Sequence, residues 1–159
     1  MFQKVLLAAA LQNWDVPTPY ACAAREVAIQ LARGSTSPLY VLTVYSYQAP
    51  PITPHPLIGA EVIQETERIL KVEEEAVRAE VEAKLRKYIQ AIEATGVAAV
   101  PLIRAGNPRE EVIRVGREIE ADLIVIGSHS KRHVFDIGGT AQAICKQASA
   151  TVVMASPSQ

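Results

Sequence analysis

The sequence predicts an α/β fold in which helices cover both faces of a parallel sheet. Short apolar or β-branched runs alternate with stretches of helical spacing along the whole chain. These runs are continuous rather than alternately polar, which is typical of strands buried on both faces of a parallel sheet. With 159 residues the chain has the length of one ordinary domain. We therefore expect a single domain over residues 1–159.

The apolar runs predict five strands, with helices in the intervals. The expected strands cover 5–10, 40–47, 97–103, 123–126 and 151–155. Strands that alternate with helices are expected to be parallel, and the crossovers between parallel strands are right-handed. A ligand crevice then lies beyond the carboxyl ends of the strands.

Two helices carry local start signals. Thr18 and Pro19 precede helical spacing over 21–32 and suit the cap and first turn of a helix. Asn107 and Pro108 form the same pair before the third helix. We expect both helices to begin at these residues.

A second helix is expected over about 60–95 and should be unusually long. Its later part carries one apolar stripe, and Gly96 provides a stop signal. Its N-terminal half is so rich in charge that we expect it to project past the sheet edge. The Glu73, Glu74 and Glu75 run is interpreted as a solvated face.

Composition excludes several classes of function. The net charge of −1 argues against non-specific nucleic-acid binding. No apolar run reaches eighteen residues, so no membrane insertion is expected, and we expect a cytoplasmic protein. Cys22 and Cys145 fall in predicted helices without a Cys/His cluster, so they are interpreted as reduced core thiols, and no metal is expected.

The most informative segment is the strand, loop and helix start between Leu123 and Thr140. A helix N-terminus that follows a glycine-containing loop suits a phosphate. An ordinary βα turn, in which the glycines relieve backbone strain, explains the same spacing. The candidate nucleotide-binding residues in this segment are Gly127, Ser128, His129, Ser130, Lys131, Gly138, Gly139 and Thr140.

Three segments carry a family resemblance: the run Ala-Asp-Leu-Ile-Val-Ile-Gly-Ser-His over 121–129, the turn over 104–108 and the segment starting at Gly138. Together they resemble the universal stress protein family. The resemblance covers nearly the whole chain. It implies a five-stranded sheet of order 3-2-1-4-5, a homodimer formed through the last strand, and a cytoplasmic stress-response role. One branch of this family binds ATP or AMP, and another does not.

Two positions depart from the pattern of the nucleotide-binding branch. Ser130 stands where that pattern has its second glycine. Seven residues lie between Ser130 and Gly138, or eight between Ser130 and Gly139, and both numbers are smaller than the spacing before the last glycine of the pattern. Ala10 stands where an Asp reads the adenine, while Val44 matches the position that lines the adenine pocket. Asp15 could replace the missing carboxylate and Trp14 could stack on a base, or both could be turn and edge residues.

Three functions remain open at this point. The first is a stress-response protein that binds or senses AMP, ADP or ATP, with a mono- or diphosphate preferred because the loop is short. The second is a nucleotide-free dimeric interaction module, and the third is a protein that binds a cyclic dinucleotide. No nucleophile and base lie close together in the sequence, so we expect no enzyme, although slow nucleotide hydrolysis is compatible with the first function.

The last strand would be an exposed, uncharged edge in a monomer. Its residues are Thr151, Val152, Val153, Met154 and Ala155, with no lysine or proline inside the run. Such an edge is a template for pairing. We therefore expect a homodimer that pairs this strand with its symmetry mate, and we expect Val153→Lys to weaken it.

Overall fold

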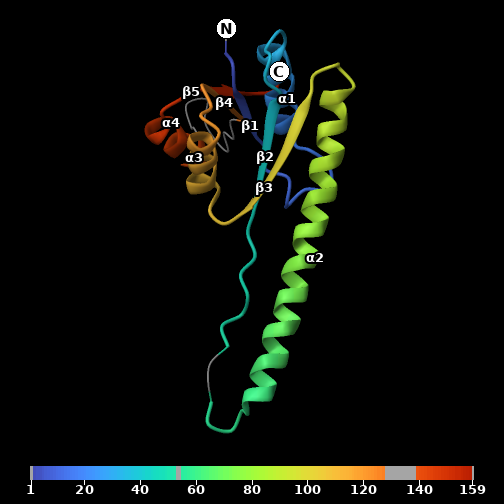
Figure 1. Ribbon diagram of the computed structural model, residues 1–159, viewed down its shortest axis with the longest axis vertical. Coiled ribbons are helices and arrows are strands. Elements are labelled where there is room, and N and C mark those ends of the chain that lie inside the picture. The colour runs from blue at the N-terminus through green and yellow to red at the C-terminus, as the bar shows by residue number, and fades with distance from the viewer. Residues whose placement is uncertain (1, 53–54, 128–138, 159) are drawn as a thin grey trace.

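The chain forms one sheet that is covered by helices, as a computed structural model describing residues 2–52, 55–127 and 139–158 shows (Figure 1). In chain order the elements are β1 (Val5–Ala8), α1 (Pro19–Ala32), β2 (Leu39–Tyr45), α2 (Ala60–Glu93), β3 (Ala99–Ala105), α3 (Pro108–Glu118), β4 (Leu123–Gly127), α4 (Gly139–Gln147) and β5 (Thr151–Ala155). The sheet has the order β3-β2-β1-β4-β5, and every pair of neighbouring strands is parallel. The expected α/β fold and strand order are confirmed.

The side chains of the strands divide between two cores, one on each face of the sheet. Val5 and Leu7 of β1 belong to the core under α1 and α2, whereas Leu6 belongs to the core under α3 and α4. This division follows from the two-residue period of a strand, which sends neighbouring side chains to opposite faces. Both faces are therefore apolar, as the continuous runs predicted.

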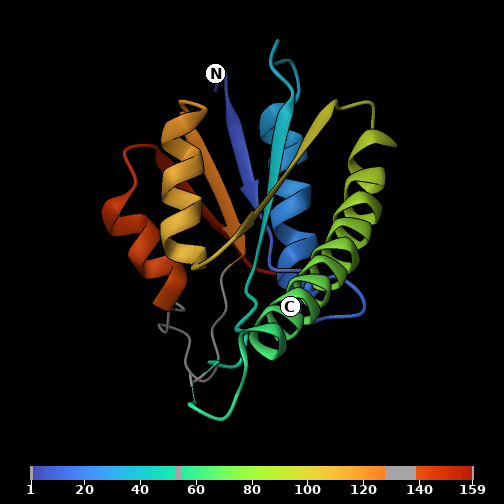
Figure 2. The same cartoon turned by 60° about the horizontal axis from the view of Figure 1, so that its bottom comes forward.

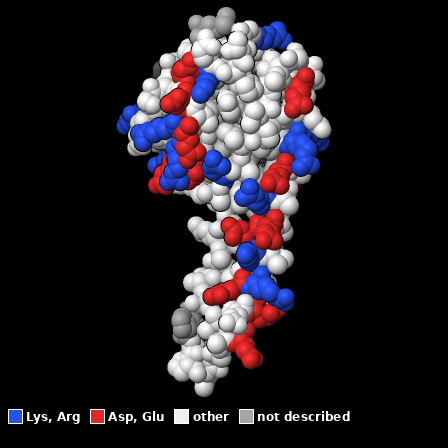
Figure 3. Space-filling view, viewed as in Figure 1, with Lys and Arg blue, Asp and Glu red and all other residues white. Residues whose placement is uncertain are grey.

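The helix α2 extends well beyond the sheet. Its 34 residues correspond to a length of about 51 Å. Its buried residues, from Val81 to Ile92, all lie in its C-terminal part, and its N-terminal part projects beside the chain that follows β2 (Figure 1). Figure 3 shows acidic and basic side chains along this projecting part. The expected projection is confirmed.

The local start signals of two helices are also confirmed. The Thr18 hydroxyl accepts a hydrogen bond from the backbone N–H of Ala21 at 3.1 Å. The Asn107 side chain accepts one from the backbone N–H of Arg109 at 2.9 Å. Both caps satisfy a donor that the helix leaves unpaired, and each is followed by a proline in the first turn.

Some expected boundaries and burials were wrong. The strand β1 ends at Ala8, and Ala10 is exposed because the chain has left the sheet. The strand β3 begins at Ala99 and tolerates Pro101, which has no N–H, because β3 is an edge strand. Cys145 is exposed and Cys22 is half-buried, so Cys145 is not the core thiol that we expected. A helical position does not by itself decide which side of the helix is buried.

Asp122 connects the N-terminus to the start of β4. Its two carboxylate oxygens accept hydrogen bonds from the backbone N–H groups of Gln3 and Lys4, at 2.8 and 3.0 Å. Slight burial raises the pKa of this carboxyl, but the backbone donors outweigh that effect, so the pKa lies below its usual value. The ionised carboxylate therefore stabilises the folded chain.

Asp122→Asn is expected to lower the free energy of unfolding at pH 7 by about 1 kcal/mol or less, because the group is exposed to screening. A depressed pKa contributes stability above the usual carboxyl range, near pH 4, and this contribution is lost as the pH falls through the lowered pKa. Urea unfolding at pH 7 and pH 3 should show the difference from wild type shrinking at acid pH. The exposed Asp15 offers the control variant Asp15→Asn; a difference that stays constant with pH would contradict the role of Asp122.

Candidate functional site

A pocket of about 410 Å³ lies where the carboxyl ends of β1, β2 and β4 meet. In Figure 2 the strands run toward one end of the sheet, where the connecting loops gather. The pocket sits beside the boundary between β1 and β4, at which the strand order reverses. Its described lining consists of Ala8, Ala9, Ala10, Trp14, Thr18, Tyr20, Ala21, Leu42, Val44, Pro108, Val112, Ile126, Gly127, Gly139, Thr140, Ala141 and Ile144. Its volume and position are those of a small-molecule site.

Three helices begin at this pocket. The first residues of α1, of α3 and of α4 contribute to its wall through Tyr20, Pro108 and Gly139. Helices that follow parallel strands start at the same edge of the sheet, so their N-termini converge there. The unpaired N–H groups and dipoles at these ends favour a negative charge in the pocket.

Arg109 is absent from the described lining, but it adds a full positive charge beside the start of α4, at the margin of the pocket. A Cβ placed on Gly139 would lie only 3.1 Å from Nη2 of Arg109, so the guanidinium lies directly against this helix start. Neither Arg109 nor Gly139 is buried. We did not single out Arg109 in the sequence; the available signal was its place in the first turn of a helix that follows a strand.

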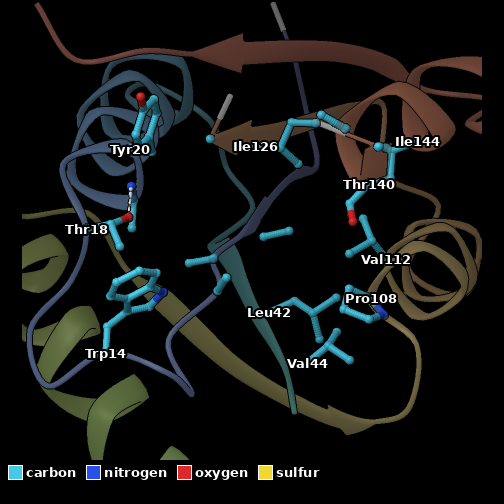
Figure 4. A pocket seen from close by; sticks show the side chains of 17 residues that line it. Trp14, Thr18, Tyr20, Leu42, Val44, Pro108, Val112, Ile126, Thr140 and Ile144 are labelled. Atoms are coloured by element: carbon cyan, nitrogen blue, oxygen red, sulfur yellow. Dashed lines mark hydrogen bonds between the residues drawn. The ribbon is translucent and has the colours of Figure 1, made fainter. Parts of the chain in front are cut away.

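The described wall of the pocket is uncharged and mostly apolar. Figure 4 shows Leu42, Val44 and Val112 on one side of the cavity and Thr18 and Tyr20 on another. Among the described lining residues, none has a carboxylate, a carboxamide, an imidazole, a thiol or an amine in its side chain. The described part of the wall can therefore enclose an apolar group, and its hydroxyl groups are those of Thr18, Tyr20 and Thr140.

Gly127 is explained by packing as well as by ligand binding. A Cβ on Gly127 would lie 3.1 Å from both the Cβ and the carbonyl oxygen of Tyr20. The end of β4 thus approaches the first turn of α1 too closely for any side chain. This contact supports the ordinary-turn interpretation for Gly127 and leaves the role of Gly139 open.

The structure brings together half of the residues that the sequence singled out. Ala10, Val44, Gly127, Gly139 and Thr140 all line the pocket. The other five predicted residues, Ser128, His129, Ser130, Lys131 and Gly138, lie outside the described residues.

Of the two loop residues that we considered as contacts to a base, the structure places only one at the pocket. Trp14 lines the pocket, whereas Asp15 is exposed and is absent from its described lining. Asp15 therefore does not supply the carboxylate missing at Ala10.

The described residues hold neither a metal-binding cluster nor a membrane-spanning helix. Over 2–52, 55–127 and 139–158, no three His, Cys, Asp or Glu side chains come together as a metal site would require. No helix in this part of the chain is both long and apolar enough to cross a membrane.

The sheet order and the pocket at its switch point define a doubly wound α/β protein of the kind that holds ligands at the strand ends. Within that class, the chain belongs to the universal stress protein family, whose model matches residues 1–156. No curated protein matches the chain in sequence.

Solved universal stress proteins share this fold at low sequence identity. One in complex with cAMP is 20% identical, with a TM-score of 0.66 over 99% of each chain. UspA from Lactobacillus plantarum is 19% identical, with a TM-score of 0.65 over 95% of this chain and 97% of that one. A universal stress protein from Archaeoglobus fulgidus in complex with dAMP is 18% identical, with a TM-score of 0.60 over 96% and 97%. At such identities the likeness shows the fold alone.

Proposed function

We propose that this protein binds an adenine nucleotide in the pocket at the strand ends and serves as a nucleotide-dependent sensor in a stress response. The observation that carries the proposal is the juxtaposition of an apolar cavity with the start of α4 and the Arg109 guanidinium. A nucleoside fits the apolar cavity, and a phosphate fits the positive end. The relatives solved with cAMP and dAMP support this assignment.

We further propose that the ligand carries one or two phosphates in preference to three, because the loop after β4 is short. Turnover is not part of the proposal, since the hydroxyls of Thr18, Tyr20 and Thr140 have no carboxylate or imidazole beside them in the described wall to activate them. A nucleotide-free interaction module is the competing function. It is favoured by Ala10, which leaves the amine of adenine without a carboxylate partner there.

The central test is titration calorimetry of the purified protein with AMP, ADP, ATP and a cyclic dinucleotide. AMP or ADP should bind more tightly than ATP. Absence of binding by all of them, together with absence of nucleotide released on denaturation, would favour the interaction module. A preference for ATP or for the cyclic dinucleotide would contradict the proposed ligand.

Gly139→Asp is expected to weaken AMP binding by about tenfold or more, equivalent to ~1.4 kcal/mol. The new carboxylate would sit against the α4 N-terminus and Arg109, where the phosphate is expected, and would repel it. Stability should not fall, because acidic residues are favourable in a first turn. An unchanged affinity in the folded variant would support the ordinary-turn interpretation.

Arg109→Ala is expected to weaken AMP binding by about fivefold, or ~1 kcal/mol, because an exposed charge is screened by solvent. The loss should shrink at high salt. Arg68→Ala is the matched control, because it removes the same charge from the projecting part of α2. Equal losses in the two variants would show a non-specific charge effect.

We propose that the protein forms a homodimer through the edge of β5 that faces away from β4. Among the described strands, β5 pairs only with β4. Val153 packs partly against the core on the α1 side, so Val153→Lys would disturb the monomer as well, contrary to our expectation from the sequence. Met154 is 38% exposed and is the better site for a test.

Met154→Lys is expected to shift the protein from dimer to monomer, because a charge near the two-fold axis meets its own copy. Sedimentation of wild type and variant at micromolar concentration checks this. Ser156→Lys, one residue past the strand, is the control. A wild-type monomer would remove the proposal, and an unaffected dimer in Met154→Lys would place the interface elsewhere.

A further inference from the structure

Trp14, the only tryptophan of the chain, stands at the pocket with its indole half-exposed. It is 48% exposed, which is unusual for so large an apolar side chain. In Figure 4 it projects from the loop between β1 and α1, across the cavity from Pro108 and Val44. One face of the wall is thus an aromatic surface that the fold itself does not cover.

The loop that carries Trp14 is held in place by polar contacts. The Gln12 side chain donates to the carbonyl of Ser46 and accepts from its N–H, both at 2.8 Å. Lys84 of α2 donates to the carbonyl of Gln12 at 2.9 Å. Leu11, which is buried, anchors the same loop in the core. The backbone of this loop is therefore held by contacts that need no ligand, which lowers the cost of presenting the indole to one.

The wall around the indole has little with which to distinguish one base from another. Adenine and guanine differ in hydrogen-bonding groups at the ring edge, and reading them takes side-chain or backbone groups that accept or donate there. Ala8, Ala9 and Ala10 stand at the end of β1 without a polar side chain, and no described lining residue has a carboxylate or carboxamide. The hydroxyls of the described lining are those of Thr18, which caps α1, Tyr20 and Thr140. Stacking on an aromatic side chain works for any base, because every base has a π-face.

We propose that Trp14 holds the base by stacking, so that the pocket accepts purine nucleoside monophosphates with little regard to the base, guanine as readily as adenine. This inference rests on the proposed function and deepens it. The phosphate is held at Gly139 and Arg109, and the base is held by its face instead of its edge. The ligand class is then set by a phosphate and a flat ring system.

Intrinsic fluorescence tests the inference directly, because Trp14 is the single tryptophan. AMP and GMP should both quench its emission, with dissociation constants within about fivefold of each other. Ribose 5-phosphate, which lacks a base, should bind about tenfold more weakly than AMP, as expected from one stacking contact.

Calorimetry then separates the contribution of the indole. Trp14→Ala should weaken AMP and GMP by a similar factor, about tenfold, while Trp14→Phe should keep most of the affinity. Val16→Ala is the matched control, because Val16 is an exposed apolar residue of the same loop outside the described lining. It should bind both nucleotides as wild type does.

The outcomes distinguish this inference from the proposed function. If neither nucleotide binds, the proposed function itself fails. If AMP binds more than tenfold tighter than GMP, nucleotide binding stands and the indifference to the base is wrong. If Trp14→Ala binds both as wild type does, or if ribose 5-phosphate matches AMP, the stacking role is wrong.

Discussion

Replacing Gly127 with valine is expected to destabilise the fold by about 1–3 kcal/mol and to abolish ligand binding. The new side chain would meet the Cβ and the carbonyl oxygen of Tyr20 at 3.1 Å. The carbonyl belongs to the first turn of α1 and cannot rotate away as a side chain could. Relief requires α1 and the end of β4 to separate, which deforms the pocket between them. Urea unfolding and AMP titration measure the two effects.

Gly139→Ala is the matched control for this variant. The added Cβ at Gly139 would meet only the Arg109 guanidinium, the far end of a flexible side chain. Its free energy of unfolding should stay within about 0.5 kcal/mol of wild type. A similar loss in both variants would show that the cost at Gly127 does not come from its contact with Tyr20.

Tyr88→Ala is expected to cost about 3–5 kcal/mol of stability, the largest effect among these variants. Tyr88 is 1% exposed and joins α2 to α1. Its hydroxyl donates to the carbonyl of Ala21 at 2.7 Å, and the Arg25 guanidinium lies 4.7 Å from its ring centroid. Removing the ring would leave a large cavity between two helices and the sheet.

Tyr88→Phe isolates the hydroxyl and should cost about 1–2 kcal/mol, since it leaves the ring in place. Burial raises the pKa of Tyr88, and the nearby Arg25 only partly offsets this rise. A raised pKa means that the neutral phenol stabilises the fold below the usual tyrosine pKa, near 10, and that this contribution declines as the pH rises beyond it. Thermal unfolding at pH 7 and above pH 10 should show the gap between wild type and Tyr88→Phe narrowing. A gap that does not change would argue against a buried hydroxyl.

The helix starts at Thr18 and Asn107 were predictable from sequence because a cap is a contact within one turn. The burial of β4 and the length of α2 were predictable because hydrophobic patterns record which faces are covered. The end of β1 was not, because β1 leaves the sheet at Ala8 while β2 continues to Tyr45, and nothing in the local pattern marks that point. Ala10 is as apolar as the residues before it.

The candidate site, too, could be predicted from the sequence only in part. The topology of alternating strands and helices already indicated the edge of the sheet at which a ligand would lie. Nothing local, however, shows that Arg109 on α3 meets Gly139 on α4, since 29 intervening residues separate them in the sequence. The local sequence also does not show that the close approach of Tyr20 leaves room only for a glycine at position 127.

By itself the sequence determined the class of fold, the order of its elements along the chain and the glycine-rich segment after β4, because each depends on local sterics or on apolar periodicity. Only the tertiary structure decided that Trp14 lines the pocket while Asp15 does not, and that Arg109 stands at the start of α4. These are contacts between segments distant in sequence. Their geometry follows from how helices pack on the sheet, which no short stretch of residues specifies.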